Sequence, residues 1–328
     1  MRRSLVSWLL FASIAASIGS LSVSRFRLDD SGRDIIQYLR IHDGTSLKEI
    51  PPPYRYRVLT PLLARAVPAL PEGLTERDRR LDEKAPLFKF AVVNLLGLAT
   101  AAWFLMRMMD AMGFGPWQSW LGGLLFLGSH FPLTTATLPV ADAWAYAFLA
   151  GCLYAVLTRR HVLLAVLFCL GIFTKEPVLI APLAAFLVRQ PWRPRVAQLC
   201  AFIPGALAYL VFRVFLFPAE VELYSVSSAS KFAAEVFGRP DRFAFYMSRA
   251  AMTFGVLWIV AAWGFWMNRR RTEHPLIRWS WLAPAILAVP FVLALNVGKV
   301  WFFSFPIVIP LAVWGLEQWS GDRDPTPG

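Results

Sequence analysis

Ionisable side chains in this sequence gather where apolar runs begin or end. Asp142 lies near the start of one apolar run, the pair Lys175 and Glu176 separates two others, and Asp34 precedes Tyr38 by four positions in a polar stretch near the N-terminus. Residues four apart share one face of a helix, so Asp34 and Tyr38 can act on the same partner. Charged groups at the edge of hydrocarbon are costly and are usually paired, cavity-facing and functional. These residues are therefore the first candidates for a site.

Carboxylates beside basic side chains suit one kind of chemistry in particular. A carboxylate can accept the proton of an attacking hydroxyl, while Arg or Lys stabilises a phosphate on which negative charge develops. Arg55 and Arg57 supply basic groups in the same N-terminal stretch as Asp34. Five further residues are weaker candidates: Asp29, Asp30, Arg213, Arg249 and Lys299. Each of these has a simpler interpretation, because Asp caps helices and Arg or Lys reaches lipid headgroups.

The composition places these residues in a membrane protein. Of 328 residues 57% are hydrophobic and 16% charged, whereas soluble domains carry about 25% charged residues. Disorder, collagen-like repeats and an ordinary cytosolic enzyme are excluded. The net charge is +12, but basic clusters between apolar runs mark the cytoplasmic side of a membrane protein, so nucleic acid is not a predicted partner. The three cysteines lie in apolar runs, which excludes a disulfide scaffold and a Cys-based zinc site.

Ten apolar runs predict an all-α, polytopic membrane protein with about ten transmembrane helices. The runs are 5–23, 88–106, 117–137, 140–157, 162–173, 178–188, 196–217, 246–267, 279–295 and 300–316. The first run could also be a cleaved signal peptide, because small residues lie near its end. We expect a single transmembrane domain, 1–328, without a soluble C-terminal domain. The two runs within 161–188 are too short for two full crossings, so the tip between them should be recessed in a cavity.

Loop charges predict the orientation of the chain. If the N-terminus is cytoplasmic, the short outside connections carry only Lys175 and Lys299. The inside connections and the C-terminal tail then carry Arg2, Arg3, Arg107, Arg159, Arg160, Arg189, Arg193, Arg195, Arg269, Arg270, Arg271, Arg278 and Arg323. We therefore expect both termini in the cytoplasm, a multi-pass protein of the inner (plasma) membrane, and the candidate site on the outer side.

The long first outer loop, residues 25–86, is expected to contain two interfacial helices. One apolar face is predicted around 35–39, with Asp34 in the first turn. A second helix should begin near Arg57, with the apolar pattern Leu59, Leu62, Leu63, Ala66, Val67 and Leu70. Residues 72–84 are charge-mixed and predict a solvated linker. Neighbouring residues on a helix point apart, so Lys175 and Glu176 should have different partners.

Four motifs stand in order along the first 190 residues: Asp34-Ile-Ile-Gln-Tyr38, Tyr54-Arg-Tyr-Arg-Val-Leu-Thr-Pro61, Asp142, and Phe173-Thr-Lys-Glu-Pro177. In this order and spacing the sequence resembles the GT-C superfamily of integral membrane glycosyltransferases, in particular its uncharacterised bacterial members. The resemblance implies many spans, a first outer loop with two interfacial helices, and a polyprenyl-phosphate-linked sugar donor used on the outer side. The remainder of the chain is similar only in hydropathy.

The resemblance and the chemistry together assign roles as hypotheses. Asp34 matches the first-loop acid and would be the general base of an inverting transfer to a hydroxyl of a lipid or glycan acceptor. Arg55, Arg57 and Lys175 would surround the donor phosphate. Three more residues would orient the substrate: Tyr38, Asp142 and Glu176. A divalent metal, Mg²⁺ or Mn²⁺, could bridge phosphate and carboxylates, although the spacing of the acids does not require one. A nucleotide-sugar donor is disfavoured by the lack of a Gly-rich motif.

Other classes of function remain open from the sequence. The main alternative is a membrane transporter or a lipid or glycolipid flippase, whose site would lie near the midplane between broken helices and often between internal repeats. No such repeat is visible, and the polar residues fall at the outer ends of the runs. A non-catalytic scaffold and a membrane acyl- or phosphotransferase are further alternatives, the last of which would require a supported histidine or a metal cluster.

Overall fold

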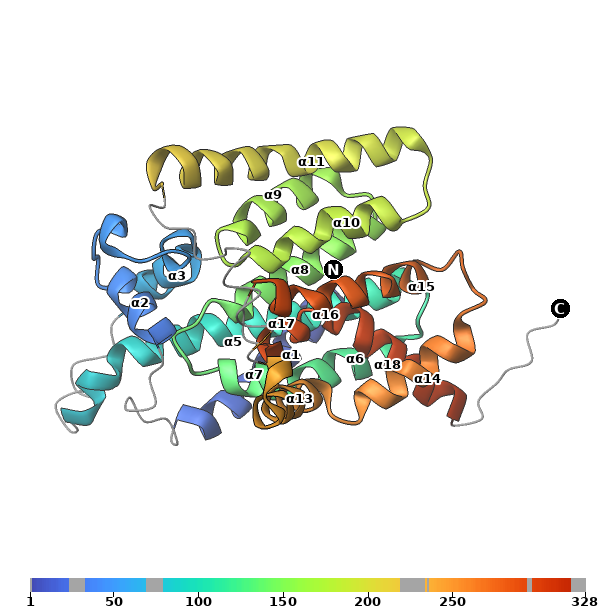
Figure 1. Ribbon diagram of the computed structural model, residues 1–328, viewed down its shortest axis with the longest axis horizontal. Helices are drawn as coiled ribbons and strands as arrows, with labels where there is room; N and C mark the ends of the chain where they lie inside the picture. The colour runs from blue at the N-terminus through green and yellow to red at the C-terminus, as the bar shows by residue number, and fades with distance from the viewer. Residues whose placement is uncertain are drawn as a thin grey trace.

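The computed structural model describes residues 2–23, 33–68, 79–218, 234, 236–293 and 297–319, and within these ranges all regular structure is helical. Figure 1 shows helices packed along a common long axis, with two short helices, α2 and α3, at one end. The expectation of an all-α protein is therefore confirmed. Asp29 and Asp30 lie outside the described residues, so the structure places neither of these two candidates.

Helix is present in each of the ten predicted apolar runs, but several runs are broken. The helices that occupy them are α1 (Arg2–Val23), α5 (Arg79–Ala111), α6 (Pro116–Leu127), α7 (His130–Thr135), α8 (Asp142–Leu157), α9 (His161–Ile172), α10 (Ile180–Leu187), α11 (Trp192–Val211), α13 (Pro240–Phe254), α14 (Leu257–Asn268), α15 (Pro275–Ser280), α16 (Leu282–Leu293), α17 (Val297–Phe302) and α18 (Phe305–Trp319). A π-turn, Phe212–Leu216, extends α11, and a 3₁₀ turn, Glu176–Leu179, precedes α10.

Ten membrane-spanning helices are not confirmed. By length and composition, two described helices can cross a membrane: Pro86–Ala111 within α5, and Trp192–Leu216, which joins α11 to its π-turn. A third span is formed if α13 and α14 count as one, and these two are bent by 69° at a break. Gly255 lies in this break with a φ of 54°, a left-handed conformation that glycine adopts without strain. Such breaks shorten the helices without changing their apolar character.

The long helix α5 positions the entry into α8. Asn94 on α5 donates hydrogen bonds from Nδ2 to the carbonyl oxygens of Thr135 (3.1 Å) and Leu138 (2.6 Å), which lie in the segment before α8. The Trp144 indole N–H donates to the carbonyl of Val93 at 3.0 Å. The carbonyls of Thr135 and Leu138 lie at the end of α7 and in the turn after it, beyond the regular hydrogen bonding of a helix. The Asn94 side chain supplies donors to both of these carbonyls. The first residue of α8, Asp142, is therefore held in a fixed place against α5.

The two helices expected in the N-terminal polar stretch are present as α2 (Arg33–His42) and α3 (Leu59–Ala66). Their apolar sides share a small core with α5 and with the chain just before α8; its buried members include Ile35, Tyr38, Ile41, Ile50, Ala64, Phe90 and Val140. The helix α3 ends before Leu70, which lies outside the described residues. This core attaches the amphipathic helices to one end of the bundle.

The prediction of a linker at 72–84 is wrong for residues 79–84, because these residues belong to α5. Residues 72–78 lie outside the described part of the chain.

Helices α14 and α18 approach each other at two glycines. A Cβ atom built on Gly264 would lie 2.0 Å from the carbonyl oxygen of Leu311, and one built on Gly315 would lie 2.4 Å from that of Val260. These contacts are with backbone, so a side chain could not be accommodated by a change of rotamer. Small residues at helix crossings let two helices pack closely. Such close packing is common in lipid bilayers, where the hydrophobic effect contributes little to helix association.

Replacing Gly264 by Leu should force α14 away from α18. Overpacking usually costs about 1–3 kcal/mol, and the backbone contact at this crossing puts the expected loss of unfolding free energy at the upper end of that range. Thermal unfolding of the purified protein in detergent measures the loss. Gly238→Ala is the control, because nothing lies within 4 Å of a Cβ atom at that position. Equal melting temperatures for the Gly264 variant and the wild type would contradict the close crossing.

Candidate functional site

A buried ion pair joins the start of α8 to the tip between α9 and α10. The Lys175 ammonium is bonded to Oδ1 of Asp142, and the two side chains are 13% and 4% exposed. The same ammonium lies 5.7 Å from the centroid of the Phe303 ring, which follows α17. Removing either charge would leave the other buried without a counter-ion, which is strongly unfavourable. The pair therefore fixes the tip against α8.

A second ion pair joins the polar N-terminal segment to the same tip. Arg57, which is buried, donates from Nη2 to Oε2 of Glu176 at 2.7 Å and from Nε to the same oxygen at 3.1 Å. The backbone N–H of Leu59 also donates to the carbonyl of Phe173, at 3.3 Å. Lys175 and Glu176 thus have different partners, as expected for neighbours whose side chains point apart.

Tyr38 on α2 is buried next to Arg57. Burial opposes the charge on Arg57, but Glu176 and Tyr38 outweigh it and raise the pKa of the guanidinium, so Arg57 stays charged. Burial also raises the pKa of the Tyr38 hydroxyl, against the opposing effect of Arg57, and Tyr38 remains a neutral phenol. The neutral hydroxyl of Tyr38 is available as a hydrogen-bonding group beside a permanent cation.

Asp34 is the most open of the three acids. Its side chain is 45% exposed, and Nζ of Lys299 lies 3.9 Å from Oδ2. The Tyr54 hydroxyl donates to Oδ1 of Asp34 at 2.5 Å. The Tyr54 ring packs edge-on against Tyr38, with centroids 5.8 Å apart, and lies 5.9 Å from the guanidinium carbon of Arg57. Asp34 therefore has a cation and a phenol beside it and water on its open side.

Tyr54 was given no role by the sequence analysis. It was part of a motif, but its side chain turns out to connect Asp34 with the buried Arg57. The short 3₁₀ turn Tyr54–Tyr56 follows three consecutive prolines, and this turn places Tyr54 on the side of α2. The contact with Asp34 spans 20 positions and no helical periodicity indicates it.

The other basic candidates lie at different distances from the acids. Arg55 donates from Nε to the carbonyl of Ile50 at 2.8 Å and from Nη1 to that of Pro218 at 3.4 Å. Arg213, in the π-turn after α11, lies 5.3 Å from the centroid of the Tyr56 ring. Arg249, on α13, lies over the Phe245 ring and forms no ion pair with the acids in the described part of the chain. The structure therefore brings all placed candidates except Arg249 to one end of the bundle.

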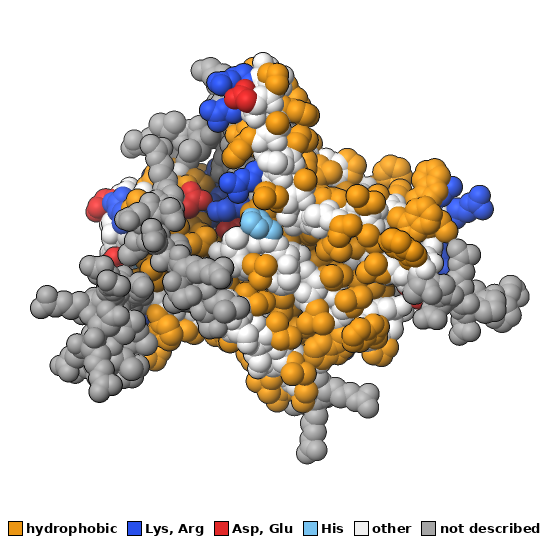
Figure 2. All heavy atoms as spheres, turned by 90° about the horizontal axis from the view of Figure 1, so that it is seen from below, with side chains coloured by type: hydrophobic (Ala, Val, Ile, Leu, Met, Phe, Trp, Pro, Cys, Tyr) orange, Lys and Arg blue, Asp and Glu red, His pale blue; other side chains and the backbone are white. Residues whose placement is uncertain are grey.

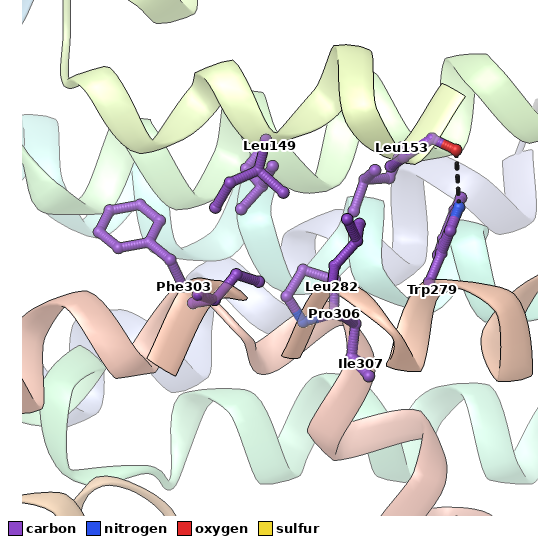
Figure 3. A pocket seen from close by; sticks show the side chains of 10 residues that line it. Leu149, Leu153, Trp279, Leu282, Phe303, Pro306 and Ile307 are labelled. Carbon is purple, nitrogen blue, oxygen red and sulfur yellow. Dashed lines mark hydrogen bonds between the residues drawn. The ribbon is translucent and has the colours of Figure 1, made fainter. Parts of the chain in front are cut away.

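Much of the described surface is apolar. Figure 2 shows hydrophobic side chains over much of the visible face, with Lys, Arg, Asp and Glu in a few places: at the top of the view, left of its centre, and at its left and right sides. A small apolar pocket lies between α8, α10 and the segment α15–α18, and Phe303 is among the residues that line it. Figure 3 shows Phe303 at one side of this pocket and, at the other, the Trp279 N–H bonded to the Ala184 carbonyl at 3.0 Å. Phe303 thus separates the pocket from the Lys175 ammonium.

The acids that the structure describes are not grouped as ligands of Mg²⁺ or Mn²⁺ would be. Among the residues that the structure describes, no three His, Cys, Asp or Glu side chains are grouped as ligands would be. Asp142 and Glu176 are already paired with Lys175 and Arg57, so a metal ion would have to compete with two cations. We therefore derive no step through a metal.

Comparisons of this chain with protein-family models, with curated proteins and with solved structures each gave no match. The arrangement of the site therefore carries the functional argument.

The buried pair between Lys175 and Asp142 can be tested through stability. Asp142→Asn should lower the unfolding free energy by about 3 kcal/mol, because it leaves Lys175 buried without a counter-ion. The double variant Lys175→Met/Asp142→Asn should lose less than Asp142→Asn alone, and thermal unfolding in detergent measures both. The exposed carboxylate of Asp43 provides the control Asp43→Asn, which should have little effect. If the double variant were less stable than the single one, the pair would not be coupled as described.

Proposed function

We propose that this protein is an integral membrane glycosyltransferase that moves a sugar from a polyprenyl-phosphate donor to a hydroxyl of a lipid or glycan acceptor. One observation carries the proposal: the partly exposed carboxylate of Asp34 lies beside the Lys299 ammonium and the Tyr54 hydroxyl at the end of an apolar helical bundle. A donor with a lipid tail can keep its chain beside such a bundle while its sugar reaches the carboxylate. The resemblance of the four motifs to the GT-C superfamily supports the same function.

The proposed reaction is a single displacement at the anomeric carbon. The acceptor hydroxyl attacks this carbon, the bond from the carbon to the phosphate oxygen breaks, and the phosphate leaves with the bonding electron pair. Asp34 receives the hydroxyl proton, and the configuration at the anomeric carbon is inverted. Cations placed beforehand around the leaving phosphate stabilise its growing negative charge. The Tyr54 hydroxyl is bonded to Oδ1 of Asp34, so the acceptor hydroxyl would approach Oδ2, which lies 3.9 Å from Nζ of Lys299.

The remaining polar residues position the reacting groups. Asp142 and Glu176 hold Lys175 and Arg57 in place through ion pairs, and Tyr38 lies between the Arg57 guanidinium and the Asp34 side of α2. We assign these residues to substrate orientation. Lys299, 3.9 Å from Asp34, keeps a positive charge beside the base and the incoming phosphate.

The proposed topology has the Asp34 end outside and both termini in the cytoplasm, with about ten helical segments in the inner membrane. Arginine-rich connections support this orientation. The connections α10–α11 and α14–α15 lie at the end of the molecule opposite α2 and α3 (Figure 1), and Arg189 and Arg278 there both contact Glu273. The segments too short to cross alone would pair across their breaks.

A transporter or flippase is the alternative, and the 69° bend between α13 and α14 favours it, since broken helices are common at transport sites. The charged side chains, however, lie at the end of the bundle, next to the amphipathic helices α2 and α3. A transport site would instead place them near the middle of the long helices. The position of the acids therefore favours an enzyme.

Asp34→Asn tests the enzyme directly. The amide cannot accept the proton, so transfer of sugar from a polyprenyl-phosphate sugar should fall by about 100-fold or more, while binding of the donor stays within a few-fold. A radiolabelled-sugar transfer assay on protein in lipid vesicles measures the first quantity. Asp43→Asn is the matched control on the chain just after α2, and it should retain full transfer.

Two results would refute the proposal. One is undiminished transfer by the Asp34→Asn protein, which would remove Asp34 from the chemistry. The other is that the wild type transfers no sugar but moves the lipid between leaflets, which would establish the flippase.

A further inference from the structure

The cations of the site are unevenly neutralised. Arg57 is paired with the half-buried carboxylate of Glu176, Lys175 with the buried one of Asp142, and Lys299 lies 3.9 Å from a third, that of Asp34. Arg55 and Arg213, within the part of the chain that the structure describes, contact backbone carbonyls and an aromatic ring instead of carboxylates. The surplus of positive charge therefore lies on Arg55 and Arg213, away from the two buried pairs.

Both arginines lie at the same edge, around Tyr56. The Tyr56 hydroxyl donates to the carbonyl of Phe217 at 3.0 Å, and Arg55 reaches the next carbonyl, that of Pro218, at 3.4 Å. Arg213 approaches the Tyr56 ring to 5.3 Å. Arg213 belongs to the π-turn Phe212–Leu216, a local widening of the helix that is frequent at functional sites. Tyr56 and the carbonyls that follow α11 thus link Arg213 and Arg55 to one edge of the molecule.

A buried hydroxyl beside these arginines adds a second, independent observation. Tyr209 on α11 is 8% exposed, and its ring centroid lies 6.3 Å from that of Tyr56. Its hydroxyl meets no described partner at regular hydrogen-bond geometry, and the group nearest to bonding it is the Arg213 guanidinium. A buried polar group without a good partner is costly. An oxygen-rich anion bound by Arg213 would complete the hydrogen bonding of Tyr209.

The outer surface of α11 indicates the source of the anion. Apolar side chains on both sides of Arg213 are largely exposed: Leu207, Leu210, Val211, Val214, Phe215 and Leu216. A long apolar chain can lie against these side chains, whereas a free phosphate ion would gain nothing from them. Arginine binds phosphate through two parallel hydrogen bonds. The combination fits one ligand class, a phosphate monoester or diester of a long-chain lipid.

We propose that Arg213 and Arg55 bind the phosphate of the lipid donor, with the Tyr209 hydroxyl as a further hydrogen-bond donor and the lipid chain against the exposed side of α11. The identity of this lipid as the donor rests on the proposed function. Arg57 and Lys175, which the sequence analysis placed around the phosphate, instead hold the tip and the N-terminal segment together through their carboxylate partners.

Binding measurements on the full chain in lipid nanodiscs test the site. The probes are a polyprenyl phosphate without sugar, the matching polyprenol, and inorganic phosphate. We expect the wild type to bind the polyprenyl phosphate more tightly than either other probe. Arg213→Ala and Arg55→Ala should each weaken that binding by about tenfold or more. Arg213→Lys keeps the charge but loses the paired hydrogen bonds, so its affinity should be intermediate.

The matched control is Arg65→Ala, which removes an exposed arginine from α3 at the same end of the molecule. It should leave binding unchanged, and thermal unfolding checks that every variant is folded. Wild-type affinity in the Arg213 and Arg55 variants would overturn the site, as would an equal loss in the Arg65 variant, which would indicate attraction by general surface charge. Inorganic phosphate bound as tightly as the lipid would overturn the assignment to a lipid.

Failure of this site and failure of the proposed function are distinguishable. If lipid phosphate binds through Arg213 but no sugar is transferred, the phosphate site is supported and the proposed glycosyltransferase activity is refuted. If sugar is transferred while the Arg213 and Arg55 variants bind the polyprenyl phosphate normally, the enzyme activity is supported and the phosphate binds elsewhere.

Discussion

Arg57 is a buried cation in a mostly apolar protein, and its position requires Glu176 to lie beside it. Glu176 in turn is carried by the tip whose other charge, Lys175, is bonded to Asp142 at the start of α8. A buried charge without its partner is far less stable than the pair, so these contacts form together or not at all. The two pairs consequently tie the N-terminal amphipathic segment to the bundle, and every other feature of the site follows from that attachment.

This arrangement divides the acids by burial. Asp142 and Glu176 are paired with cations that they hold in place, whereas Asp34 is partly exposed, with Tyr54 and Lys299 beside it among the described residues. A carboxylate that must take up and release a proton needs such access, and one that holds a cation in place does not. The arginines divide in the same way, since Arg57 is committed to Glu176 while Arg55 and Arg213 contact no carboxylate among the described residues. On our account, catalysis and phosphate binding use the uncommitted groups.

The sequence predicted part of this site because its charges are rare in apolar surroundings. Asp142, Lys175 and Glu176 stand out at the ends of apolar runs, and the opposite directions of neighbouring side chains indicated two partners for Lys175 and Glu176. The role of Tyr54 could not be recognised in this way, and Arg213 ranked only as a weaker candidate, because their contacts depend on local turns: a 3₁₀ turn after three prolines and a π-helical turn at the end of α11. The apolar runs also predict longer helices than the structure contains. The sequence stays apolar across Gly255, but the helix ends there.

The most direct measurement is a structure of the protein with a polyprenyl-phosphate sugar bound, determined by electron cryomicroscopy in lipid nanodiscs. Our account predicts that the phosphate lies between Arg213 and Arg55, that the anomeric carbon is turned toward Asp34, and that both buried ion pairs remain intact. Donor density at the centre of the bundle, with Asp34 facing away from the sugar, would contradict the account and would favour transport.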